Sequence, residues 1–248
     1  MANTYLTRTI STASNRRTWT WSAWIKRSDL TTGYQTLFSS DVDANDMTRI
    51  LFWDSQELTV SSKTGGSFPI DLRTKAIQRD PSAWYHIVVA MDTTQTTYTD
   101  RLKVYVNGVQ ETEFYGSSAS YPTLDYDTWI NSTNPQIIGK SQTYNGLYGG
   151  SMAMVQFVDG LQLTPAYFGS TDSTTGIWTP QASSTISSYG TNGFKLKMDT
   201  ATPGADTSGN TNNFTVGGGT PTLTQGSPSN VYATLNSIDN IAASTFSN

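Results

Sequence analysis

Apolar and polar residues alternate along much of residues 17–158. Between residues 17 and 27, Trp19, Trp21, Ala23 and Ile25 fall on one face of an extended segment, opposite Thr18, Thr20, Ser22, Trp24 and Lys26. A period of two between Gly, Pro, Asn and Asp turn residues is typical of short β-strands. The predicted strands span residues 17–27, 34–39, 47–53, 57–61, 67–72, 84–92, 101–107, 109–115, 135–140, 150–158 and 193–198.

Helix-forming signals are scarce. We expect one helical turn at residues 164–168, where Thr164 can cap the N-terminus and Pro165 can take the first position. The Asn107-Gly108 pair predicts a two-residue hairpin turn, because both residues tolerate positive φ. Many short strands and little helix predict an all-β, antiparallel jelly-roll β-sandwich. Its expected core includes Trp19, Trp21, Ile87, Val89, Val104 and Val106.

Composition narrows the function classes. The formal net charge is −4 and only 14% of residues are charged, so we expect no nucleic-acid partner. The chain has no cysteine, which excludes disulfides and thiolate metal sites. No stretch approaches the roughly 20 apolar residues of a membrane span, and residues 1–8 lack the apolar core of a signal peptide. We therefore expect synthesis in the cytoplasm and no membrane partner.

The character of the chain changes towards its C-terminus. We divide it into a sandwich domain, residues 1–199, and an extended arm, residues 200–248, rich in Thr, Ser, Gly and Asn. Such a segment has too few apolar residues to offset about 1–2 kcal/mol of backbone entropy per ordered residue. We therefore expect it to pack on the sandwich or on another subunit. The expected anchors are Phe214, Val216, Val231, Tyr232 and Leu235.

Several motifs occur in the order found in one family. They are Trp19-Thr-Trp-Ser-Ala-Trp-Ile-Lys-Arg27, Leu37-Phe-Ser-Ser40, Trp84-Tyr-His-Ile-Val-Val-Ala-Met-Asp92, Val104-Tyr-Val-Asn-Gly108 and Tyr148 to Pro165. Together they resemble the laminin-G-like, concanavalin A-like jelly rolls over roughly residues 17–168. The resemblance implies a fold that serves mostly as a binding scaffold, so function must be argued from loops and partners.

A second resemblance covers nearly the whole chain. Segments such as Phe157-Val-Asp-Gly-Leu-Gln-Leu-Thr-Pro165, Asp172 to Trp178, Asp206 to Thr215 and Ser227 to Leu235 resemble structural proteins of tailed, especially marine, phages. This implies a virion protein, in a capsid decoration, appendage or fibre, that binds other virion subunits, forms homo-oligomers and binds host-surface glycans. The alternative is a free carbohydrate-binding, lectin-like module.

Catalysis has little support in the sequence. Related glucanases carry several carboxylates on one strand, whereas Glu57, Glu111 and Glu113 are the only glutamates here and form no such run. His86, the single histidine, lies within a predicted strand, where a packed, hydrogen-bonded ring is expected rather than a catalytic base. We therefore predict no enzymatic activity, no catalytic residue and no cofactor.

One loop has the spacing of a calcium ligand set. Asp41, Asp43 and Asn45 match the start of an EF-hand loop, but Asp46 stands where glycine is required and Phe52 where the bidentate glutamate would be. The family that the chain resembles often has an acidic residue in its closing strand, where Met152-Ala153-Met154 stands here. We therefore expect a polar turn, with calcium binding as the alternative.

Aromatic residues make up 12% of the chain. Several lie in or near predicted loops, where they could stack on sugar rings or contact a protein partner. These candidates for a glycan or protein interface are Tyr115, Tyr121, Tyr126, Trp129, Tyr144 and Tyr148.

Overall fold

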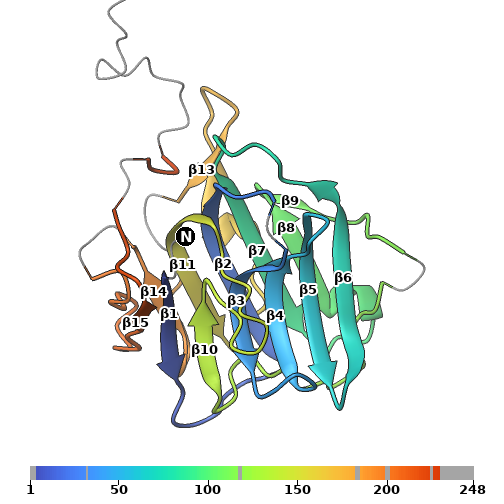
Figure 1. The fold of residues 1–248 in the computed structure, drawn as a ribbon. Coiled ribbons are helices and arrows are strands. Elements are labelled where there is room, and N and C mark those ends of the chain that lie inside the picture. Colours follow the sequence, from blue (N-terminus) through green and yellow to red (C-terminus); the bar gives the residue numbers. More distant parts are fainter. Residues whose placement is uncertain are drawn as a thin grey trace, which may run out of the picture.

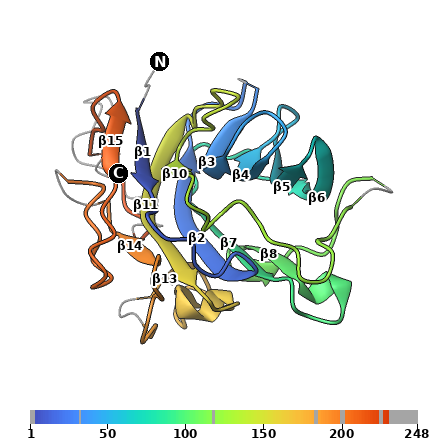
Figure 2. The same ribbon diagram turned by 90° about the horizontal axis from the view of Figure 1, so that it is seen from below.

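A computed structural model describes residues 4–31, 33–116, 119–181, 185–198, 202–223 and 226–229. These residues form two antiparallel sheets packed face to face (Figures 1 and 2). One has seven strands, in the order β15 (Thr215–Gly218), β1 (Thr4–Thr9), β10 (Pro135–Ile138), β3 (Gln35–Asp41), β4 (Met47–Phe52), β5 (Glu57–Thr64) and β6 (Ser67–Ile77). The other has six, in the order β14 (Phe194–Leu196), β11 (Gly150–Asp159), β2 (Thr18–Arg27), β7 (Tyr85–Asp92), β8 (Leu102–Val106) and β9 (Val109–Gln110). The all-β sandwich prediction is confirmed.

The core forms where the apolar faces of the two sheets meet. Across the six-stranded sheet, Trp21 of β2 lies opposite Val89 of β7, which lies opposite Val104 of β8. The Trp21 ring then stacks on Phe38 of the seven-stranded sheet, with ring centroids 6.0 Å apart. Trp19, Trp21, Ile87, Val89 and Val104 are buried as predicted, and Val106 is partly buried against the same core.

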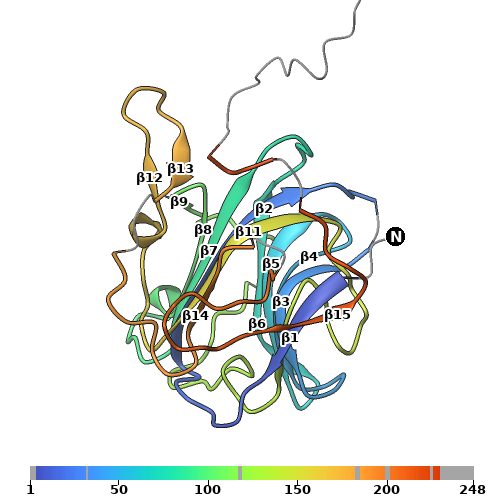
Figure 3. The same ribbon diagram turned by 90° about the vertical axis from the view of Figure 1, so that its left-hand side faces the viewer.

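The outer face of the six-stranded sheet is also covered. Val88, Ala90 and Tyr105 pack there against Val158, Leu163, Phe168 and Tyr189. The covering segment includes a 3-10 turn, Pro165–Tyr167, and the small hairpin of β12 (Gly169–Thr171) and β13 (Trp178–Pro180), seen at the upper left of Figure 3. Burial on both faces explains why β7 is a nearly unbroken apolar run.

The hairpin turn after β8 forms at the predicted residues. Asn107 and Gly108 have φ of 50° and 83°. Gly108 is required for a second reason, because a Cβ atom there would lie 2.7 Å from Trp178 of β13. The return strand β9 ends at Gln110, short of the predicted residue 115, because the chain leaves to lie along β6, where the Lys75 amide donates to the Glu113 carbonyl.

Part of the predicted arm is an edge strand of the sandwich. β15 pairs with β1 in antiparallel register, with Val216 opposite Leu6, and Figure 3 shows the two side by side. Phe214 is 6% exposed and packs edge-on against Phe194 at 4.7 Å. The Val216 side chain is 38% exposed, so this residue is held through its backbone. The other predicted anchors, Val231, Tyr232 and Leu235, lie outside the described residues.

Candidate functional site

Three aromatic side chains gather at one end of the seven-stranded sheet. Tyr34 precedes β3, Trp53 follows β4, and Tyr144 lies in the connection between β10 and β11. The register places Gln35 opposite Phe52, so the adjacent residues Tyr34 and Trp53 also meet, with ring centroids 4.6 Å apart. Tyr34 and Tyr144 are 6.5 Å apart. We call Tyr34, Trp53 and Tyr144 the aromatic platform.

The platform is open to solvent. Tyr34 is 37% exposed and Tyr144 is 42% exposed. Flat, partly exposed rings are suited to stacking on the apolar face of a sugar or on a protein side chain. The three rings come from three separate connections of the sheet and meet edge to face, with interplanar angles of 73° between Tyr34 and Trp53 and 61° between Tyr34 and Tyr144, so the cluster depends on the fold.

Two arginines lie against these rings. Arg73 of β6 lies over Trp53, 3.9 Å from the ring centroid, and its Nε and Nη2 donate to the two carboxylate oxygens of Asp71, each at 3.0 Å. The hydrogen bonds that Arg73 donates to Asp71 raise the pKa of Arg73. Arg49 of β4 lies 4.7 Å from the centroid of Tyr144 and is only 4% exposed. Both guanidinium groups therefore stack on platform rings.

Asp41, at the end of β3, fixes the loop that carries Tyr144. Its Oδ2 accepts hydrogen bonds from the Ser141 hydroxyl at 2.6 Å and from the Thr143 amide at 3.2 Å. The Tyr144 amide in turn donates to the Ser141 hydroxyl at 3.2 Å. Asp41 is 1% exposed, so these bonds form in a site of low dielectric, where they are strong.

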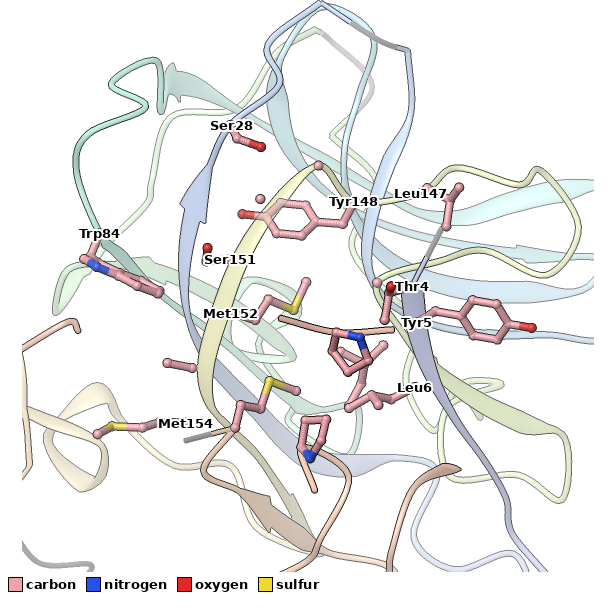
Figure 4. Close-up of a pocket in the computed structure, with 18 of the residues that line it drawn as sticks. Thr4, Tyr5, Leu6, Ser28, Trp84, Leu147, Tyr148, Ser151, Met152 and Met154 are labelled. Carbon is pink, nitrogen blue, oxygen red and sulfur yellow. The ribbon is translucent and has the colours of Figure 1, made fainter. Parts of the chain in front are cut away.

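A groove lies beside Tyr34 and Tyr144 of the platform, and Figure 4 shows part of its lining. Its volume is about 1260 Å³. Tyr34 and Tyr144 line it together with apolar side chains of both sheets and residues 220–223 and 226–228 of the C-terminal segment. Figure 4 shows Leu6, Tyr148 and Met152 on its walls, from β1, the β10–β11 connection and β11.

The predicted interface aromatics do not form one surface. Tyr144 belongs to the platform, and Tyr148 is buried on the groove wall, where burial raises the pKa of its hydroxyl. Tyr121 contacts Tyr98 at 5.4 Å, and Tyr115 is exposed nearby. The Tyr126 hydroxyl hydrogen-bonds to Ser62 and Thr64, and the Trp129 indole donates to the Lys63 carbonyl.

Sequence reasoning missed Tyr34, Trp53, Arg49 and Arg73. Arg49 alternates with core residues in the predicted strand at residues 47–53, which indicates that it faces away from the core, whereas Arg73 lies just beyond the predicted strand at residues 67–72. The meeting of Tyr34 with Trp53 depends on the pairing of β3 with β4, which no local pattern specifies.

The loop with calcium-like spacing uses its oxygens to form a turn. Asp43 Oδ1 accepts from the amides of Asn45 at 2.7 Å and Asp46 at 3.0 Å. Asp41 points into the β10–β11 connection instead. Across the described residues, no three His, Asp or Glu side chains are grouped so that they could hold a metal ion. That the loop forms a polar turn without calcium stays a prediction, with calcium binding as the alternative that experiment must test.

Glu111, Glu113 and His86 lie apart from the platform, whereas Glu57 of β5 lies beside it, because the Trp53 amide donates to the Glu57 carbonyl at 2.9 Å. Glu113 pairs with Lys75 at 2.9 Å on the surface, which lowers its pKa, whereas partial burial raises the pKa of Glu111. His86 is fully buried between Trp24 and Trp178. In the described part of the chain, no helix is long and apolar enough to cross a membrane.

Comparisons with known proteins identify the superfamily of this chain. A model of the concanavalin A-like lectin/glucanases superfamily matches residues 2–167. A search of curated protein sequences found no significant match.

Solved structures that resemble the chain include a native heptameric SAP-like pentraxin from Limulus polyphemus, with 20% identity and a TM-score of 0.44 over 65% of this chain and 71% of that one. Domain 4 of AbnA, a GH43 extracellular arabinanase from Geobacillus stearothermophilus solved with arabinotriose, has 21% identity and a TM-score of 0.46 over 62% and 65%. The enzymatically active domain of tailspike protein 2 of bacteriophage CBA120 has 12% identity and a TM-score of 0.44 over 65% and 25%. Because the family model spans well over half of the residues, the chain belongs to the concanavalin A-like lectin/glucanases superfamily.

Proposed function

We propose that this chain is a non-catalytic saccharide-binding domain of a bacteriophage virion protein, and that the aromatic platform is its binding site. The observation that carries the proposal is the arrangement of the exposed Tyr34 and Tyr144 and the half-buried Trp53 beside the Arg73–Asp71 ion pair. Sugars present apolar ring faces and hydroxyl groups, and a few aromatic rings beside fixed polar groups match both.

The carboxylates around the platform favour binding over hydrolysis. Most glycosidases use two carboxyl groups flanking the bond, roughly 5–9.5 Å apart, with one free to protonate the leaving group. Here Asp71 is held bidentate by Arg73, Asp41 is buried and holds the loop, and Glu57, next to Trp53, is only 8% exposed. Incubation with β-glucans, host polysaccharide and peptidoglycan should release no reducing ends. Turnover abolished by Glu111→Gln or Glu113→Gln would contradict a purely binding role.

The segments of the sequence that resemble phage structural proteins support the virion assignment. One of these segments, Asp206 to Thr215, lies against the sandwich. The Asp206 carboxylate there accepts from the amides of Lys195, Ser208 and Asn212. Mass spectrometry of purified particles should find the chain at a defined copy number. Its absence from particles, with retained saccharide binding, would favour the alternative of a free lectin-like module.

A glycan array tests the binding function itself. The whole chain, labelled at a surface lysine such as Lys103, should be retained by a defined set of saccharides. Competition by the same free saccharide should remove it. Uniform lack of retention over bacterial surface and storage glycans would contradict saccharide binding and leave protein–protein assembly as the role.

A further inference from the structure

The Arg49 guanidinium is a buried charge without a hydrogen bond inside the described structure. Its Nε–H is fully buried and has no partner among the described residues. The ion pairs found in that part of the chain involve Arg17, Arg73 and two lysines, not Arg49. Burial also lowers its pKa, although the nearby Asp41 opposes this effect. A buried charge is costly unless hydrogen bonds or a counter-ion satisfy it, so the free donors of Arg49 call for a partner.

The neighbouring arginine shows the contrast. Arg73 also stacks on a platform ring, but Asp71 occupies its fork of N–H donors with two hydrogen bonds of 3.0 Å. Asp41 is the one carboxylate whose charge acts on Arg49 noticeably, but it makes no hydrogen bond to it. The Oδ2 atom of Asp41 accepts from Ser141 and Thr143, and its Oδ1 atom has no partner among the described residues. Beside the platform, the guanidinium of Arg73 is therefore hydrogen-bonded to a carboxylate, whereas that of Arg49 has N–H donors without an acceptor within the described structure.

Arg49 lies where a platform ligand would meet it. Tyr144, the ring stacked on Arg49, is itself 42% exposed, and Tyr34 lies close enough to influence the same guanidinium. A ligand that stacks on these two rings would therefore lie next to the Arg49 guanidinium.

We propose that the platform recognises acidic saccharides, with the sugar carboxylate bound by Arg49 while the pyranose ring stacks on the neighbouring aromatic rings. A carboxylate can accept two parallel N–H bonds from a guanidinium, and such charge-assisted pairs are about twice as strong as neutral hydrogen bonds. This inference rests on the proposed function and specifies its substrate class.

The test compares ligands that differ in charge alone. An array carries uronic-acid and sialic-acid oligosaccharides, each beside its carboxyl-reduced counterpart, and the best pair is then titrated by calorimetry. The intact chain should bind the acid at least about tenfold more tightly, which corresponds to roughly 1.4 kcal/mol. Arg49→Met should remove that preference and keep the affinity for the reduced sugar, whereas Arg49→Lys should keep part of the preference.

Two further variants keep the test decisive. Arg16→Met is the matched control, because Arg16 also stacks on an aromatic ring, Trp129, at 5.2 Å, away from the platform. It should leave the preference unchanged. If Arg49→Met alone fails to fold, Arg49→Gln, which removes the charge but keeps a polar side chain, replaces it. Equal affinity for acid and reduced sugar, or a preference that survives in Arg49→Met, overturns this inference and leaves saccharide binding intact. Failure to bind any saccharide overturns the proposed function as well.

Discussion

The indole Nε1 of Trp178 donates a 3.0 Å hydrogen bond to Nδ1 of His86. Because an indole can only donate, Nδ1 must be the acceptor and the ring proton must lie on Nε2, which is 2.8 Å from the Ser22 hydroxyl. His86 is thus fixed as a neutral tautomer in a buried layer. The contact between Ser22 and His86, which resembles part of a catalytic triad, is a packing arrangement, because Trp24 and Trp178 cover the two faces of the histidine ring.

This burial makes stability depend on pH. Desolvation lowers the pKa of His86 to about 3, from an ordinary value near 6.5 in the unfolded chain. Between these values the unfolded state binds a proton that the folded state does not, so stability falls as pH decreases, by about 1.4 kcal/mol per pH unit. Denaturant titrations from pH 7 to pH 4 measure the slope.

His86→Gln provides the comparison, because it keeps a polar side chain but does not titrate. The free energy of unfolding of this variant should be lower at pH 7, because the hydrogen bond from Trp178 is disturbed. It should fall less steeply as the pH decreases, since the variant takes up about one proton fewer on unfolding. Identical slopes for both proteins would show that His86 is protonated in the folded state.

Trp21 should be among the most sensitive core positions. It is fully buried and stacks on Phe38 across the two sheets, so Trp21→Ala should lower the free energy of unfolding by about 3–5 kcal/mol. Exposed Tyr98→Ala is the control and should change stability little. A loss below about 1 kcal/mol at Trp21 would mean that the sheets do not pack through this ring.

The arm should stabilise the sandwich through its first part. Phe214 is buried against Phe194, so Phe214→Ala should cost about 3 kcal/mol, whereas Val216→Ala, on the exposed side of β15, should be nearly neutral. Deleting residues 200–248 should destabilise the chain at least as much as Phe214→Ala and should weaken incorporation into particles. Thermal melts and particle incorporation of the variants measure both effects. Full incorporation of the truncated chain would show that the arm is no assembly element.

Mutation of Asp43 should lower the thermal stability of the chain, whereas calcium should leave it unchanged. Since Asp43 Oδ1 accepts from the amides of Asn45 and Asp46, Asp43→Ala should lower the melting temperature by the same amount in calcium and in chelator. Differential scanning fluorimetry in both buffers measures this. A saturable calcium-dependent rise that disappears in Asp43→Ala would establish a metal site.

The strands and the core could be predicted because their signal is local. The alternation from Trp19 to Ile25 predicts which face of β2 meets the other sheet, although residues of the opposite face, such as Trp24, are buried as well. The platform could not be predicted in the same way. Tyr34 and Trp53 stand just outside their strands, and only the register of Gln35 with Phe52 joins them. The pairing of β15 with β1 likewise joins segments more than 200 residues apart in a chain of 248. The polar composition of the C-terminal segment does not indicate which strand it pairs with.

The affinity of platform variants for the saccharide best retained on the array tests saccharide binding most directly. Calorimetric titration should show that Trp53→Ala and Tyr144→Ala each weaken binding about tenfold or more, since central aromatic contacts dominate such interfaces. Tyr98→Ala removes an exposed ring that contacts Tyr121 rather than the platform and should bind as tightly as the intact chain. Unchanged affinity in both platform variants, with their folding intact, would contradict the assignment of the site, and loss of binding in Tyr98→Ala alone would move it to the Tyr98–Tyr121 surface.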